Sequence, residues 1–107
     1  MRKIFERMAA LVRECCDPDE IFLFGSFAKG IATVDSDVDL IVVGDFGARK
    51  AVVRQEIAET LSQFPLGVDV LLLSPREIAE AAGNPQAFLA SALSSSILLY
   101  RRGPETG

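Results

Sequence analysis

The stretch that most constrains this chain is 25–39, because it joins two short apolar runs through small and acidic residues. The runs occupy 21–24 and 40–43. Short runs rich in aromatic and β-branched residues are typical of buried strands. Gly25-Ser26 interrupts the first run, since glycine adopts backbone conformations that end a regular strand. The sequence therefore predicts two strands of a buried sheet, joined by a polar segment.

Two acidic residues stand where the second strand is expected to begin. Side chains two positions apart share a face of a strand, so Asp37 and Asp39 point the same way. Carboxylates this close repel one another unless a cation lies between them. Asp69 adds a third carboxylate within the apolar run 68–73, and no basic residue within six positions neutralises it. Three acids from two strands suit a two-metal site for phosphoryl-type transfer, with Mg²⁺ as the natural cation.

The Gly25-Ser26 pair is the predicted phosphate site. Ser26 is expected to cap a short helix over 27–29, whose free N–H groups would attract anions. We interpret Lys29 as a solvated surface lysine rather than a phosphate contact, because lysine is mostly exposed. Asp35 is interpreted as a turn residue, not as a ligand.

This combination resembles the signature of the DNA polymerase β-type nucleotidyltransferase superfamily. The matching elements are Gly25-Ser26, ten residues, then Asp37-x-Asp39, with Asp69 at the place of the family's third acid. The short length is similar to that of the minimal nucleotidyltransferases (MNT), which are often encoded beside a HEPN-type partner as toxin–antitoxin pairs. The resemblance covers most of the chain.

The resemblance implies an enzyme that moves a nucleoside monophosphate, AMP from ATP as the first expectation, to a hydroxyl acceptor. Gly25 and Ser26 would bind the nucleotide's phosphates. Asp37 and Asp39 would hold two Mg²⁺ ions, and Asp69 would complete the metal site and accept the hydroxyl's proton. The acceptor implied is a HEPN-type toxin, with this chain as its antitoxin. The implied fold is a small mixed β-sheet with helices packed against it, in the α/β (α+β) class.

Other interpretations explain fewer of these residues. An EF-hand loop starting at Asp35 needs Gly and Glu where Leu40 and Phe46 stand, and no Gly-Lys-Ser/Thr supports a P-loop. A plain polar turn explains 25–36 but not the acids within strands. The alternative function is a non-catalytic antitoxin or binding subunit with a degenerate nucleotide site. Self-modification or a small-molecule acceptor also stays open.

Composition narrows the chemistry and the compartment. A length of 107 residues indicates one domain, expected over 1–100, with a disordered tail at 101–107. The absence of histidine excludes Ser-His-Asp and Cys-His catalysis. A net charge of −4 argues against direct nucleic-acid binding. The adjacent Cys15 and Cys16 and the lack of a secretory or membrane-length apolar run predict a cytoplasmic protein without a membrane partner.

Outside the strands, helical periodicity and start and stop residues predict four further helices. They span 4–15, 48–64, 75–82 and 86–93. The segment 97–100 is either a short strand or the end of the last helix's packing. Together with strands at 21–24, 38–43 and 68–73, this order predicts a small sheet covered by helices.

Overall fold

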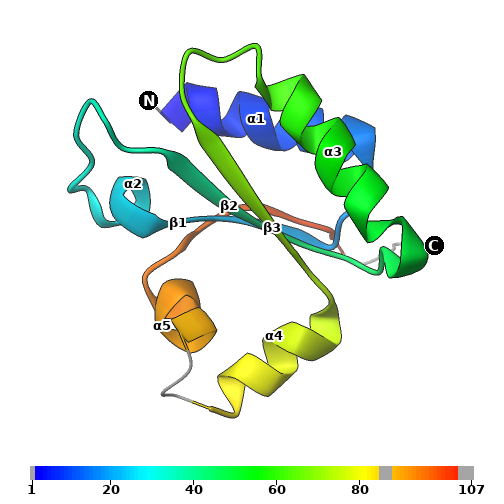
Figure 1. The fold of residues 1–107 in the computed structure, drawn as a ribbon. Helices are drawn as coiled ribbons and strands as arrows, with labels where there is room; N and C mark the ends of the chain where they lie inside the picture. The colour runs from blue at the N-terminus through cyan, green and yellow to red at the C-terminus, as the bar shows by residue number, and fades with distance from the viewer. Residues whose placement is uncertain (1, 85–87, 104–107) are drawn as a thin grey trace.

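The structure is a computed structural model that describes residues 2–84 and 88–103. Its strands are β1 (Glu20–Phe24), β2 (Val38–Val43), β3 (Val68–Leu73) and β4 (Ile97–Arg101). They form one sheet in the order β3-β2-β1-β4 (Figure 1). β1 pairs antiparallel with β2 and β4, whereas β2 and β3 are parallel. The predicted mixed sheet is confirmed.

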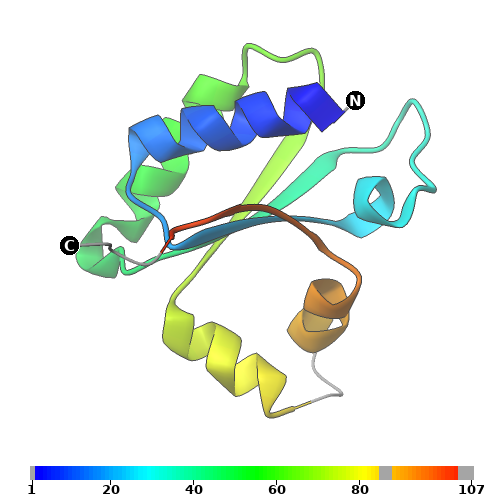
Figure 2. The same ribbon diagram turned by 180° about the vertical axis from the view of Figure 1, so that it is seen from behind.

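Helices cover both faces of this sheet. They are α1 (Arg2–Cys15), α2 (Gly25–Lys29), the 3₁₀ helix η1 (Gly47–Arg49), α3 (Lys50–Leu61), α4 (Pro75–Ala82) and α5 (Phe88–Ser94). α1 and α3 pack on one face, and α4 and α5 lie on the other (Figures 1 and 2). α2 stands at the end of the sheet where β1 ends. The fold is thus an α+β arrangement in three layers.

Over 40–43 β2 is buried on both sides, which explains the uninterrupted apolar run at these four positions. Leu40 and Val42 point into the core beneath α1 and α3, and Ile41 and Val43 point into a smaller core beneath α4 and α5. Full burial of one such aliphatic side chain contributes about 1.5–3 kcal/mol. Because side chains alternate along a strand, Asp39 lies on the α4 and α5 side.

The start of α4 follows its sequence closely. The Glu77 N–H donates to the Ser74 hydroxyl over 3.1 Å, and the Ser74 N–H donates to the Glu77 carboxylate over 3.0 Å. This reciprocal capping box, with Pro75 at the first helical position, satisfies N–H groups that no helical carbonyl reaches. The predicted start of this helix is confirmed.

The helix expected over 48–64 is shorter in the structure, where α3 is preceded by η1. At its end, the Ser62 hydroxyl donates to the Glu59 carbonyl over 2.6 Å. The Gln63 side-chain amide donates to the Thr60 carbonyl over 2.9 Å. Polar side chains satisfy the last helical carbonyls, so the chain leaves the helix before the proline that was expected to stop it.

The alternative left open for 97–100 is decided in favour of a strand, because β4 pairs with β1 along its length. Part of the helix predicted over 86–93 lies in 85–87, outside the described residues. Of the helices that the structure describes, none combines the length and the apolar character needed to cross a bilayer.

The last described residues are attached to the sheet rather than detached from it. Arg101 ends β4 and forms an ion pair with Glu20 at 2.9 Å, and Arg102 forms one with Asp17 at 2.8 Å. The tail expected from residue 101 therefore does not begin there. Its remainder, 104–107, lies outside the described residues.

Candidate functional site

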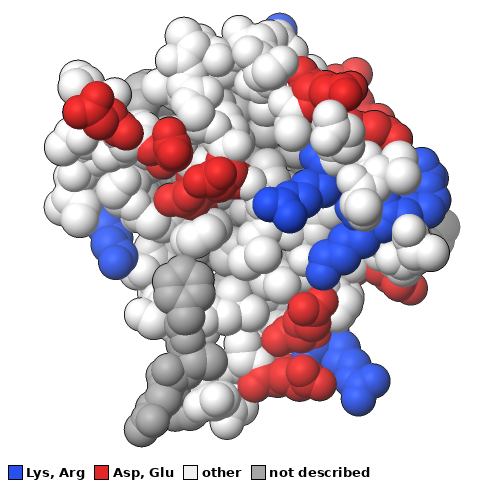
Figure 3. All heavy atoms as spheres, viewed as in Figure 1, with Lys and Arg blue, Asp and Glu red and all other residues white. Residues whose placement is uncertain are grey.

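The predicted acids lie together at one end of the sheet. Asp39 in β2 is the register partner of Asp69 in parallel β3 and of Phe24 at the end of β1. Asp37 precedes Asp39 by two residues, lies directly before the first residue of β2, and is near enough for its charge to act on Asp39. Figure 3 shows a row of acidic side chains on this side of the molecule, where Figure 1 has α2 and the start of β2.

Two glycines make room for these carboxylates. Gly25 has φ of +75°, and a Cβ built there would overlap a carboxylate oxygen of Asp39. A Cβ built at Gly67 would overlap a carboxylate oxygen of Asp37. A side chain at either position would force the neighbouring carboxylate to move, and Gly25 also needs a residue that tolerates positive φ. Gly67 was not among the predicted site residues.

The electrostatics of the site are dominated by uncompensated negative charge. Asp39 is half-buried, and Asp37 and Asp69 are exposed. Burial, followed by the charges of Asp69 and Asp37, raises the pKa of Asp39 above its ordinary value. In residues 2–84 and 88–103, no ion pair involves any of the three acids. A cation at this site would relieve the repulsion.

The carboxylates do not form a closed metal site. Among the described residues, no three Asp, Glu, Cys or His side chains are grouped so that they could hold one metal ion. The Asp39 carboxylate lies against Gly25 and that of Asp37 against Gly67. Like charges separate when no cation holds them together. The all-oxygen donors fit a hard divalent cation such as Mg²⁺, although these rotamers do not surround one.

The expected helix cap by Ser26 is wrong. α2 begins at Gly25, Phe24 occupies the cap position, and no side chain caps the helix. The reason is that β1 runs directly into α2 without a linker, so Ser26 falls inside the first turn. Its carbonyl accepts a hydrogen bond from the Ile31 N–H over 3.0 Å. Its half-buried hydroxyl makes no hydrogen bond within the described part of the chain.

A cleft of about 320 Å³ opens beside Asp39. One wall is formed by Phe24, Gly25, Lys29 and Asp39, and the other by Ser91 and Ala92 of α5 and by Ser95 in the turn after it. A polar, partly open cavity of this size suits part of a small ligand. The cleft joins the predicted phosphate residue Gly25 to a predicted metal ligand, and Lys29 supplies a positive charge.

Two serines that line this cleft were not among the predicted site residues. Lys29 is exposed, as the sequence predicted, and it also lines the cleft, one turn after Gly25. Ser91 lies in α5 and Ser95 in the turn after it, and nothing in the sequence indicates that this segment covers the site.

A family model described as "Nucleotidyltransferase domain" matches residues 1–100. A protein of Methanocaldococcus jannaschii that bears the name "Putative protein adenylyltransferase" is 31% identical over 70 residues. That match covers 61% of this chain and 48% of the relative, so the chain spans about half the length of this relative.

Two solved toxin–antitoxin structures resemble the fold. One, with AMP-PNP, superposes with a TM-score of 0.67 at 22% identity and covers 91% of this chain and 73% of that one. The other is a tri-AMPylated Shewanella oneidensis HEPN toxin in complex with an MNT antitoxin. It superposes with a TM-score of 0.61 at 21% identity, and the match covers 95% of this chain and 74% of that one. At these identities the likeness shows the fold alone.

Proposed function

Because the chain belongs to the nucleotidyltransferase domain family, we propose that it is a Mg²⁺-dependent adenylyltransferase that moves AMP from ATP to a hydroxyl of a partner protein. The partner proposed is a HEPN-type toxin, which the added nucleotide silences, so the chain acts as an antitoxin. The observation that carries this proposal is the register of Asp39 with Asp69, two residues from Asp37 and beside Gly25.

In this proposal ATP occupies the cleft between α2 and α5. The backbone of Gly25 and the free hydroxyl of Ser26 bind its phosphates. Lys29, which lines the same cleft, attracts the negative charge of the triphosphate. Ser91 and Ser95 offer hydroxyl groups on the opposite wall and orient the rest of the nucleotide.

Mg²⁺ is proposed to be held by Asp37, Asp39 and Asp69, where two ions would neutralise the charge that develops on the reacting phosphate. The raised pKa of Asp39 is consistent with this assignment, because burial and then the charges of Asp69 and Asp37 disfavour its charged form, which a cation would stabilise. Asp39 is close to both of the other acids. It pairs in register with Asp69 of β3, and it follows Asp37 by two residues in the chain.

Asp69 is proposed to accept the proton of the acceptor hydroxyl. It is exposed and lies on the edge strand β3, so an acceptor can reach it from solvent. The hydroxyl oxygen forms a bond to the α-phosphorus, the bond from that phosphorus to the bridging oxygen breaks, and pyrophosphate leaves. The carboxylate carries the released proton.

The protein acceptor rests on similarity. The curated relative is named a protein adenylyltransferase, and one similar structure contains an AMPylated HEPN toxin. The two free cysteines, Cys15 and Cys16, support the proposal of a reducing, cytoplasmic setting. Neither a nucleic acid nor a membrane is part of this proposal.

The test is calorimetric titration of the purified chain with ATP, with and without Mg²⁺. Wild type, Asp37→Asn and Asp39→Asn are compared, with Asp35→Asn as the control because it removes the same charge from the exposed turn. We expect Mg²⁺-dependent ATP binding that the first two variants lose and the control keeps. A co-expressed HEPN partner should then gain mass in units of AMP.

An inhibitor that acts by contact alone gives a different pattern. The chain would still neutralise its partner when Asp37→Asn and Asp39→Asn are combined, and the partner would gain no mass. That result would replace the proposed enzyme with the non-catalytic antitoxin.

A further inference from the structure

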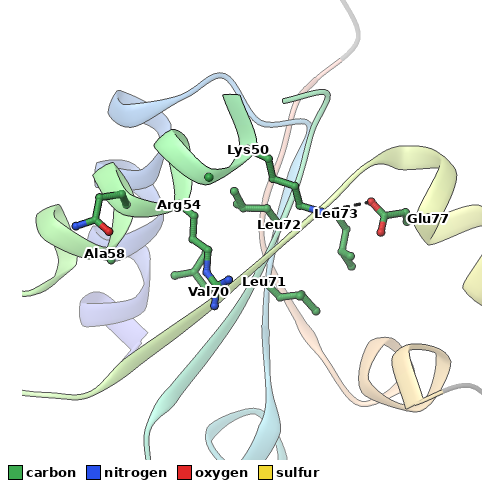
Figure 4. A pocket seen from close by; sticks show the side chains of 10 residues that line it. Lys50, Arg54, Ala58, Val70, Leu71, Leu72, Leu73 and Glu77 are labelled. Atoms are coloured by element: carbon green, nitrogen blue, oxygen red, sulfur yellow. Dashed lines mark ion pairs between the residues drawn. The ribbon is translucent and has the colours of Figure 1, made fainter. Parts of the chain in front are cut away.

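A groove of about 660 Å³ lies between α3 and the free edge of β3 (Figure 4). Residues 70–73 of β3 form its floor, and one face of α3 forms its wall. On that face Ala51 and Ala58 stand two helical turns apart and contribute only methyl groups. These small side chains therefore leave the wall open toward β3 at two positions, where a further segment of backbone can approach.

β3 pairs with β2 on one side only, because it is the first strand of the sheet. The carbonyls of Gly67 and Leu73 accept hydrogen bonds from residues at the two ends of β2. Backbone groups alternate in direction along a strand, so those of Val70 and Leu72 point away from β2. These outward N–H and C=O groups form a ready edge to which an extended chain can add.

The groove is positively charged on a chain of net charge −4. Lys50 pairs with Glu77 at 3.8 Å, whereas Arg54 forms no ion pair within the described residues. Figure 4 shows Arg54 reaching from α3 toward Val70 of β3, and Lys50 pointing toward Glu77. Two cations face one acid here, so the groove favours an acidic ligand.

The same edge leads to the candidate active site. Leu73 and Asp69 are separated by four residues of one strand, a span of about 13 Å. A segment that runs along the edge from the Glu77 end therefore has its far end beside Asp69. Leu71 lines the groove and is 39% exposed, so it offers an apolar contact to this segment.

We propose that the β3 edge binds an extended, acidic segment of the acceptor protein by strand addition, and that this segment brings its hydroxyl group to Asp69. The chemistry at Asp69 rests on the proposed function. The docking does not, because neither ATP nor Mg²⁺ contributes to the groove.

The probe is a pair of fluorescein-labelled peptides of nine residues that alternate Glu and Val. One carries Tyr at its amino end and the other at its carboxyl end, since either strand direction can add to an edge. Fluorescence anisotropy is measured without ATP and Mg²⁺. We expect at least one peptide to bind, and the double variant Lys50→Glu/Arg54→Glu to weaken binding by about tenfold or more.

Two controls are included. The first tests whether binding depends on the charges of the groove rather than on the overall charge of the protein. The second tests whether the peptide pairs with β3 as a strand rather than by charge attraction alone. Lys3→Glu/Arg7→Glu makes the same charge change on the exposed face of α1 and should leave binding unchanged. Peptides N-methylated at odd or at even positions keep their charge and lose alternate N–H donors. One of the two patterns should abolish binding, and the other should preserve it.

Absence of binding by both peptides at concentrations up to about 1 mM overturns the proposal. It is also overturned if the α1 variant weakens binding as much as the groove variant, or if both N-methylated patterns bind like the parent peptide. Asp39→Asn should bind the peptide normally, so a failure of nucleotide transfer leaves the docking result intact. Conversely, if the groove variant modifies a HEPN partner at the wild-type rate, the docking is wrong and the proposed function stands.

Discussion

The two ends of the sheet differ in whether their acidic side chains have basic partners. We call them the arginine end and the acidic end. At the arginine end, acids and arginines are matched: Glu20 with Arg101, and Asp17 and Asp19 with Arg102. At the acidic end, three acids lie without a basic partner in the described part of the chain: Asp37, Asp39 and Asp69.

This difference distinguishes charges that stabilise the fold from charges that the fold keeps in position. At the arginine end the charges attach the last strand to the rest of the sheet. At the acidic end the backbone pairing of β2 with β3 keeps like charges in register despite their repulsion. Such an arrangement costs stability and is typical of functional sites, where charge is positioned for a ligand rather than for the fold.

The largest effect is expected from removing charge at the acidic end. Asp39→Asn or Asp37→Asn should lower the rate of AMP transfer by about 10²–10³-fold or more, the scale seen when one electrostatic group is deleted from an active site. The rate is measured as incorporation of labelled AMP into a co-purified HEPN partner. Asp35→Asn is the matched control, and equal loss in that variant would contradict the assignment.

A second effect, on stability, tests the role of the backbone at the acidic end rather than of its charges. Gly25→Ala should destabilise the protein by about 1–3 kcal/mol, because alanine is strained at positive φ and its Cβ would displace Asp39. Gly30 also has positive φ, at +73°, but a Cβ there meets nothing within 4 Å. In denaturant unfolding Gly30→Ala should therefore cost less and should leave ATP binding unchanged. Equal losses in the two variants would remove the role of the Asp39 overlap.

A smaller effect is expected at the arginine end. Arg102→Met removes the ion pairs to Asp17 and Asp19 and the hydrogen bond of 2.8 Å to the Asp17 carbonyl. Exposed ion pairs contribute little, so the melting temperature should fall slightly. AMP transfer should be unchanged after correction for folding. A loss of transfer in fully folded protein would show that the two ends are coupled.

The smallest effect concerns stability against pH without Mg²⁺. The folded-state pKa of Asp39 is raised, so its protonated form stabilises the fold at low pH and this contribution is lost as pH rises through that pKa. Asp39→Asn cannot lose a proton. Its melting temperature should therefore exceed that of wild type by an amount that grows as pH rises through the raised pKa of Asp39, and Mg²⁺ should narrow the gap. A gap independent of pH would contradict the charge explanation.

Much of this arrangement was predictable because it is local. The spans of β2 and β3 follow from apolar runs with defined ends, and the start of α4 follows from Ser74 and from Pro75 at the first helical position. The errors also have local causes. Ser26 could not cap a helix that starts directly from a strand, and α3 ended early where polar side chains satisfied its carbonyls.

The sequence by itself determined that Asp37 and Asp39 stand two positions apart at the start of a strand, and it predicts a shared face for them because the two-residue period of a strand needs no information from the rest of the chain. Only the tertiary structure decided that Asp69 lies opposite Asp39, that Gly67 makes room for Asp37, and that α5 closes the cleft. Strand register and helix placement depend on contacts between residues far apart in the chain, where the packing of the whole core selects one arrangement. The open edge of β3 is likewise a property of the sheet and not of any segment.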